Sequence, residues 1–282
     1  MQQNYQPIGV FDSGYGGLTI LKSILEELPQ YDYIYLGDNA RTPYGSRSFD
    51  VVYEYTLQAV MKLFSMGCQL VILACNTASA KALRTIQQND LPVFDPSRRV
   101  LGVIRPSAER IPFYTRTGHI GILGTSGTVL SRSYPLEIAK ISGDHLVVMQ
   151  EACPMWVPLV ENDEIDNPAA DYFVQKNIRN LFRHDPEIDT VILGCTHYPL
   201  LIPTILKYLP DQVTLLDQGP IVAQSLVDYL IRHPEIDQKC SKAGSRRFLT
   251  TESVQNFEPR AGMFLGQPLT AEKIQLGCLK LK

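Results

Sequence analysis

The sequence lacks the features that mark several large classes of protein. Lysine and arginine (26) do not outnumber aspartate and glutamate (29), so the formal net charge is −3 and no basic surplus exists to neutralise phosphates. The longest apolar runs, such as residues 70–75, are far too short to cross a membrane. The first residues show no signal-peptide pattern. We therefore expect a cytoplasmic protein with neither nucleic acid nor a membrane as partner.

Disulfides and metal sites are also disfavoured. The chain has six cysteines, an even number, but a cytoplasmic protein keeps its thiols reduced. No Cys-x-x-Cys pair occurs, and the five histidines do not cluster with the cysteines at zinc-site spacing. We therefore expect no metal, which leaves core packing or catalysis as the roles of the cysteines.

What the sequence does contain is a regular alternation of strand-like and helix-like segments. Its 282 residues correspond to about two domains. Strands are expected at residues 7–11, 33–36, 70–74, 119–123, 146–149, 190–193 and 213–216, and helices at 17–28, 51–66 and 77–87. Such alternation predicts an α/β fold, with parallel sheets covered by helices on both faces.

Two pairs of segments indicate an internal repeat. Residues 8–18 (IGVFDSGYGGL) correspond to residues 120–130 (IGILGTSGTVL), and residues 71–77 (VILACNT) to residues 191–196 (VILGCT). We expect two similar flavodoxin- or Rossmann-like α/β domains with the active site in the cleft between them. The first would comprise residues 1–98 and 211–282, and the second residues 99–210. The chain would cross at a hinge within residues 92–99 and again near Pro210.

Cys75 and Cys195 each follow an expected strand and precede an expected helix. Ligands of parallel α/β sheets bind at these strand ends, and a helix N-terminus lowers the pKa of a nearby thiol. Two opposed thiols, one a base and the other an acid, could invert a carbon centre by proton transfer on opposite faces. The other cysteines, Cys68, Cys153, Cys240 and Cys278, lack this matched context, and Cys68 is expected in the core.

A glycine-rich segment, residues 12–17, separates the first expected strand from its helix. Its glycines, at 14, 16 and 17, do not have Gly-x-Gly-x-x-Gly spacing, and it lacks the Lys and Ser/Thr of a P-loop. Asp38 closes the next strand, where a dinucleotide site would carry an acid, so a Rossmann-type nucleotide-binding module stays an alternative. In the racemising interpretation, Asp12 and Ser13 point into the cleft.

Three dipeptides supply further polar groups to the same strand ends. They are Asn76-Thr77, Thr196-His197 and Tyr44-Gly45. The first two can bind an ammonium or carboxylate group, although their threonines would serve equally as helix N-caps. His197 could tune the proton affinity of Cys195, and Tyr44-Gly45 could close the site. Glu151, at the end of another expected strand, is a candidate carboxylate in the cleft.

Four motifs in order resemble the bacterial glutamate racemase family of the aspartate/glutamate racemase superfamily. They are FDSGYGGL at 11–18, GDNARTPYG at 37–45, ACNTAS at 74–79 and LGCTHYP at 193–199. The resemblance covers about residues 7–230, whereas the chain from Arg246 onward matches the family poorly. It implies cofactor-independent interconversion of L- and D-glutamate by two-base proton transfer at Cα, which supplies D-glutamate for peptidoglycan. Racemisation of aspartate or another amino acid is an alternative, as is a redox or interaction protein that uses its thiols.

The resemblance also implies roles for individual residues. Cys75 and Cys195 would be the proton acceptor and donor, with Cys75 acting on D-glutamate and Cys195 on L-glutamate. Asp12 and His197 would assist them. The substrate would be lined by Asp12, Ser13, Tyr44, Gly45, Asn76, Thr77, Thr196 and His197, with Thr125, Thr128 and Glu151 nearby. Glutamate would be the small-molecule partner, no cofactor would be needed, and the resemblance allows a homodimer.

Overall fold

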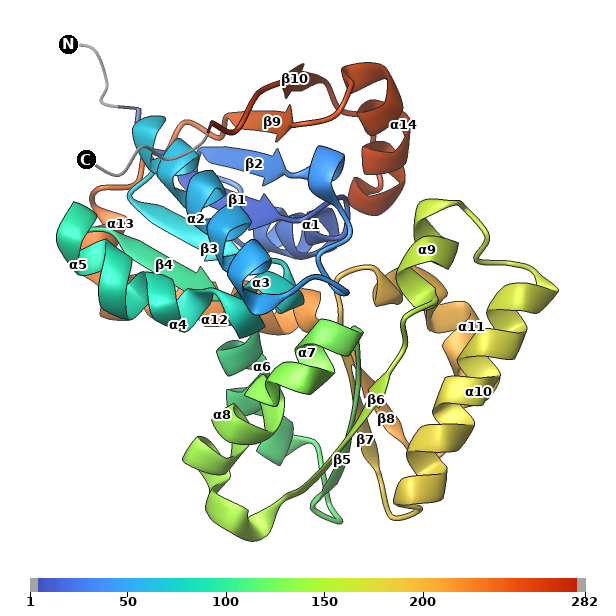
Figure 1. Cartoon of the computed structure of the whole chain (residues 1–282). Helices are drawn as coiled ribbons and strands as arrows, with labels where there is room; N and C mark the ends of the chain where they lie inside the picture. The colour runs from blue at the N-terminus through green and yellow to red at the C-terminus, as the bar shows by residue number, and fades with distance from the viewer. Residues whose placement is uncertain (1–4, 278–282) are drawn as a thin grey trace.

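Ten short strands form two separate parallel sheets in the computed structural model, which describes residues 5–277 (Figure 1). The strands of the first sheet, in spatial order, are β10 (Ala271–Lys273), β9 (Arg246–Thr250), β2 (Tyr33–Gly37), β1 (Ile8–Asp12), β3 (Leu70–Leu73) and β4 (Arg99–Gly102). Those of the second are β6 (Val147–Ala152), β5 (His119–Gly124), β7 (Thr190–Gly194) and β8 (Thr214–Leu216). We call the parts built on them the first and second lobes.

The two sheets repeat one topology. Within each lobe the first strand is central, the second lies on one side of it, and the third and fourth follow on the other: β2-β1-β3-β4 and β6-β5-β7-β8. The two strands β9 and β10 extend the first sheet beyond β2. The expected fold class of two similar parallel α/β units is therefore confirmed. Successive strands are added first on one side and then on the other side of β1 and β5. Open α/β sheets bind ligands at the position where the strand order reverses in this way.

Helices cover both faces of both sheets. In chain order they are α1 (Gly17–Glu27), α2 (Phe49–Ser65), α3 (Asn76–Lys81), α4 (Leu83–Thr85), α5 (Leu91–Phe94), α6 (Ile104–Arg110), α7 (Ser126–Ser131), α8 (Ser133–Ser142), α9 (Trp156–Glu161), α10 (Pro168–His184), α11 (Ile202–Leu206), α12 (Gln218–Arg232), α13 (Pro234–Asp237) and α14 (Val254–Leu265). Successive strand residues face opposite layers: Val10 of β1 packs with α1 and α12, and Phe11 packs with α2 and α3.

The helices that follow β4 and β8 pack on the opposite lobe. Ile104 and Ala108 of α6 lie in a core cluster with β5 and β7, and α6 packs against α8. Conversely, α12 follows β8 but packs along α1, with Val222 and Leu226 in the core of the first lobe. Each lobe therefore contains a helix that enters from the fourth strand of the other.

The strands place both crossings later than the sequence predicted. The second domain was expected to begin at residue 99, but β4 pairs with β3 and belongs to the first sheet. The return was expected at residue 211, but β8 pairs with β7 and belongs to the second sheet. The crossings therefore follow Gly102 and Leu216. The segment 92–99, expected as a hinge, runs from α5 into β4 within the first lobe.

The end of the chain, expected to match the family poorly from Arg246 onward, completes the first lobe. It supplies β9, β10 and α14, and α14 packs against α1 (Figure 1). Cys68, Cys153 and Cys240 are buried free thiols in the core clusters, and Cys278 lies outside the described residues. Among residues 5–277, no helix has the length and apolar character needed to span a membrane.

Candidate active site

The two matched cysteines stand at equivalent places in the two lobes. Cys75 follows β3 and Cys195 follows β7, the third strand of each sheet, and each residue is 6% exposed. Their local contexts differ from the expected pair of helix N-termini. Cys75 is itself the N-cap of α3, and its sulfur accepts the Ala78 N–H at 3.4 Å. Cys195 is followed by a short 3₁₀ turn, Tyr198–Leu201, before α11.

The surroundings of Cys75 favour the protonated thiol. Burial, reinforced by the nearby Asp12 carboxylate, raises its pKa to about 12, although the bonds to Ser13 and Ala78 act in the opposite direction. Its thiol donates to the Ser13 hydroxyl at 3.4 Å. The expected lowering of this pKa at the start of α3 is present as the bond from the Ala78 N–H, but burial raises the pKa by more.

Asp12 lies at the contact between the lobes. It is fully buried, accepts the Gly14 N–H at 2.8 Å, and accepts the Thr196 hydroxyl of the other lobe at 3.4 Å. Burial raises the pKa of this carboxyl group, and the charge of His197 opposes that rise. The glycines of residues 12–17 permit this approach. A Cβ at Gly16 would lie 2.2 Å from Thr196 Oγ1, well inside van der Waals contact.

His197 connects Cys195 to a carboxylate that the sequence did not reveal. Its Nδ1 lies 3.9 Å from Cys195 Sγ, and its Nε2 lies 3.0 Å from Oε1 of Glu161, the last residue of α9. Burial alone would lower the pKa of the imidazole, but the contacts with Cys195 and Glu161 raise it to about 10. His197 is therefore an imidazolium at neutral pH, with its ring edge-on to Phe264 of α14.

Glu151, the carboxylate named from the sequence, is turned away from the cysteines. It lies on β6 and accepts hydrogen bonds from Asn177 at 2.7 Å and Asn180 at 3.2 Å, both on α10. The expectation that it faces the cleft is therefore wrong. Glu161 ends α9, whose sequence carries no recognisable motif. Its contact with His197, 36 residues away, could therefore not be predicted from the neighbouring sequence.

Three threonine hydroxyls meet across the lobe boundary. Thr77 Oγ1 of α3 lies 3.0 Å from Thr125 Oγ1, which in turn lies 3.1 Å from Thr128 Oγ1. Thr125 caps α7, whereas Thr77 does not cap α3, because Cys75 takes that position. The Thr77 hydroxyl can thus reach the second lobe. Together these hydroxyls form a small cluster of donors beside an α-helix N-terminus, suited to a carboxylate.

The remaining predicted residues are buried in the same region with their side chains already engaged. Asn76 donates to Gln218 at 2.6 Å and accepts the Tyr134 hydroxyl at 2.7 Å, and neither partner was singled out from the sequence. The Tyr44 hydroxyl donates to Asp38 at 2.5 Å, and its ring lies in the same core cluster as Cys75. The Gly45 carbonyl accepts the Gly127 N–H of α7 at 2.8 Å, which docks this loop on the second lobe.

The nucleotide-binding alternative fits this arrangement poorly. Asp38, its candidate ribose ligand, is fully buried and receives hydrogen bonds from Arg41, Tyr44 and Thr251. The glycine-rich turn is occupied by the other lobe, because Gly16 abuts Thr196 and His197. A pyrophosphate would have to displace both contacts. Within residues 5–277, no group of three or more His, Cys, Asp or Glu side chains is arranged to hold a metal ion.

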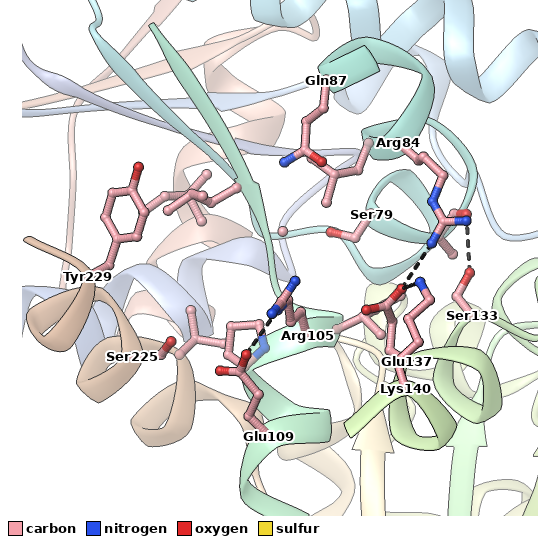
Figure 2. Close-up of a pocket in the computed structure, with 18 of the residues that line it drawn as sticks. Ser79, Arg84, Gln87, Arg105, Glu109, Ser133, Glu137, Lys140, Ser225 and Tyr229 are labelled. Atoms are coloured by element: carbon pink, nitrogen blue, oxygen red, sulfur yellow. Dashed lines mark hydrogen bonds and ion pairs between the residues drawn. The ribbon is translucent and has the colours of Figure 1, made fainter. Parts of the chain in front are cut away.

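A cavity of about 660 Å³ lies elsewhere, between α3, α4, α6, α8 and α12, and includes none of the predicted site residues (Figure 2). Its charged walls are largely paired internally. Arg84 contacts Glu137 at 3.1 Å, Arg105 contacts Glu109 at 2.9 Å, and Lys140 also contacts Glu137 (Figure 2). The lining includes Gly102 and residues of α6 and α12, so the cavity borders both crossings between the lobes. It includes neither Cys75 nor Cys195.

Comparison with known proteins gives a consistent result. The family model described as Asp/Glu/Hydantoin racemase matches residues 8–226. The glutamate racemase of Geobacter metallireducens is 38% identical over 94% of both chains. A glutamate racemase structure from Bacillus anthracis superposes with a TM-score of 0.88 at 36% identity, covering 97% of this chain and 99% of that one. One from Francisella tularensis in complex with D-glutamate gives 0.84 at 30% identity, with the same coverage.

Proposed function

Since this chain belongs to the Asp/Glu/hydantoin racemase family and is an amino-acid racemase, we propose that it interconverts L- and D-glutamate by proton transfer between Cα and two cysteines. The observation that carries the mechanism is the equivalent placement of Cys75 and Cys195 after the third strands of duplicated sheets. Glutamate as substrate is supported by the names of the relatives, one of which holds D-glutamate.

The reaction balances with no other reactant. One cysteine, as thiolate, removes the Cα proton and leaves a carbanion whose charge is shared with the carboxylate. The other cysteine, as thiol, donates a proton to the opposite face, which inverts the centre. After each turnover the former thiolate is a thiol and the former thiol is a thiolate. The enzyme can then catalyse the reverse reaction, or it can exchange protons with solvent and return to its starting form.

The charges around the cysteines favour one starting form. Burial and Asp12 keep Cys75 protonated, whereas the His197 imidazolium places positive charge beside the Cys195 sulfur. We therefore propose that Cys75 acts first as the acid, with Cys195 as its partner base. By family resemblance this is the direction from L- to D-glutamate.

Charge that develops on the substrate carboxylate needs donors that are already oriented. The cluster of Thr77, Thr125 and Thr128, together with the N-terminus of α7, supplies hydroxyl and backbone donors where both lobes meet. Asp12 is suited to the α-ammonium group, since it is a buried carboxylate beside Cys75. Ser13, Tyr44, Gly45, Asn76 and Thr196 complete the proposed substrate contacts.

The direct test is loss of ellipticity from D-glutamate mixed with the purified protein, without added cofactor. Cys75→Ala and Cys195→Ala should each abolish racemisation. In deuterated water, Cys75→Ala should still exchange the Cα proton of L-glutamate, and Cys195→Ala that of D-glutamate, because one base remains in each. Racemisation by either variant would exclude the paired-cysteine mechanism.

Substrate identity needs a separate measurement. A panel of aspartate, alanine, glutamine and glutamate should show the highest kcat/KM for glutamate, and a preference for aspartate would replace glutamate in the proposal. A role in peptidoglycan synthesis predicts that cells depleted of this protein recover on D-glutamate. A homodimer is a further expectation, to be tested by light scattering at working concentrations.

A further inference from the structure

A closed ring of three hydrogen bonds begins at the residue after Cys75. Asn76 Nδ2 donates to Gln218 Oε1 at 2.6 Å, Gln218 Nε2 donates to Tyr134 Oη at 2.7 Å, and the Tyr134 hydroxyl donates to Asn76 Oδ1 at 2.7 Å. The three side chains are at most 2% exposed. Buried hydrogen bonds of this kind are strong and directional, and each lost partner leaves a desolvated polar group.

The hydrogen bonds run in one direction around the ring. Tyr134 has a single hydrogen, which it gives to Asn76, so it must accept from Gln218. Gln218 gives its second hydrogen to Ser107 Oγ at 2.7 Å, and Ser107 in turn donates to the Val103 carbonyl at 2.9 Å. The ring uses one of the two N–H groups of Asn76. The ring fixes the orientation of the other, which would serve the substrate contact proposed above for Asn76.

The ring also ties the Cys75 turn to both crossings between the lobes. Asn76 opens α3 in the first lobe, and Tyr134 lies on α8 in the second. Gln218 opens α12 immediately after β8, and Ser107 lies on α6 after β4. The duplicated lobe has no matching amide, since the residue after Cys195 is Thr196, whose hydroxyl donates to Asp12. The arrangement therefore acts on one cysteine of the pair.

We infer that Tyr134 and Gln218 are positioning residues for racemisation, which hold the Asn76 amide and with it the Cys75 turn in the orientation that proton transfer requires. This inference rests on the proposed function. Neither residue needs to touch the substrate, because each acts through Asn76. Loosening the ring should slow the transfer that involves Cys75 and leave the transfer at Cys195 less affected.

The test uses the variants Tyr134→Phe and Gln218→Met. Each keeps the approximate shape of the side chain and opens the ring of three hydrogen bonds. Each should lower kcat about ten- to hundredfold, the range expected when a buried polar partner is lost. The matched control is Tyr33→Phe. Tyr33 is also a buried tyrosine that donates one hydrogen bond, to the Leu28 carbonyl at 2.9 Å, but it lies at the start of β2, away from the cysteines. It should retain wild-type kcat.

Two readouts separate positioning from a general structural role. With Cα-deuterated substrate, the isotope effect should rise for the enantiomer that Cys75 deprotonates and fall towards 1 for the other, because only one transfer is slowed. In addition, Tyr134→Phe should have no further effect in an Asn76→Ala background, since Tyr134 acts through Asn76. Both readouts require that the wild-type protein racemises glutamate. If it does not, the proposed function fails before any ring variant is measured, so the two failures are distinguishable.

Three results would overturn the inference. One is an unchanged ratio of the two isotope effects in both ring variants. Another is additive loss of kcat in the Tyr134→Phe/Asn76→Ala double variant. The third is loss of the folded circular dichroism spectrum in both ring variants, because the ring would then serve stability alone.

Discussion

Replacing Glu161 by glutamine should shift the pH range over which the enzyme works. The wild-type carboxylate lies 3.0 Å from His197 Nε2, and the contacts with Glu161 and Cys195 raise the pKa of His197 to about 10. A hydrogen bond to a charged group contributes about 1.5–3 kcal/mol, and one pH unit corresponds to about 1.4 kcal/mol. The glutamine oxygen still accepts but carries no charge. The pKa of His197 should therefore fall by about one to two pH units.

The sign of the effect follows from the charge that His197 supplies. Imidazolium is present below its pKa, so activity that depends on this charge is retained at low and neutral pH and lost as pH rises through that pKa. The alkaline limb of the kcat/KM profile should lie near pH 10 in the wild type and at about pH 8–9 in Glu161→Gln. Near pH 7 the two enzymes should differ little, since His197 is charged in both.

The measurement combines that profile with NMR titration of ¹⁵N-histidine, in which His197 is assigned by its loss in His197→Gln. Glu151→Gln is the matched control, because Glu151 bonds to Asn177 and Asn180 and should leave the titration of His197 unchanged. The reasoning fails if Glu161→Gln leaves both the titration and the alkaline limb in place, or if Glu151→Gln shifts them equally.

Other parts of the two lobes give independent tests. Gly16→Ala should lower activity more than tenfold and cost about 1–3 kcal/mol of unfolding free energy, measured in urea, because its Cβ would lie 2.2 Å from Thr196 Oγ1. Gly277→Ala, with nothing within 4 Å, is its control. Alkylation of Cys75 by iodoacetamide, followed by peptide mass spectrometry, should be slow at pH 7 and accelerate towards pH 12, where its thiolate forms; fast reaction at neutral pH would contradict the burial argument. The stability that His197 contributes should be fully present below about pH 6.5 and disappear as pH rises through about 10, a trend that urea unfolding of His197→Gln should lack.

The sequence revealed those parts of the fold and site that local patterns encode. β1, β3, β5 and β7 are buried apolar runs, and the cysteines after β3 and β7 stand in repeated surroundings. By contrast, β4 and β8 are short edge strands with partly exposed residues. The sequence therefore did not assign them to the preceding sheets, and the predicted crossings lie before these strands instead of after them. The tail strands β9 and β10 begin in polar or loop-like sequence and were not predicted.

The site residues that escaped prediction depend on contacts between distant segments. Glu161 reaches His197 from α9, Phe264 reaches the same ring from α14, and Gln218 meets Asn76 from 142 residues away. None of these residues stands in a motif, because their roles follow from how the lobes meet. The cap of α3 was missed for a different reason. Threonine is a common N-cap and sulfur is not, so the sequence favoured Thr77 over Cys75.

The reciprocal placement of α6 and α12 resembles a domain swap carried out within one polypeptide. Each half of the duplicated fold lends its last helix to the other, so neither half can bury its core alone. Unfolding of one lobe would strip Val222 and Leu226, or Ile104 and Ala108, from their apolar surroundings in the other. The two lobes should therefore unfold in a single cooperative transition. Each exchanged helix would move with the lobe that receives it, so rotation of the halves would pivot at the crossings after Gly102 and Leu216 and would change the distance between the two cysteines.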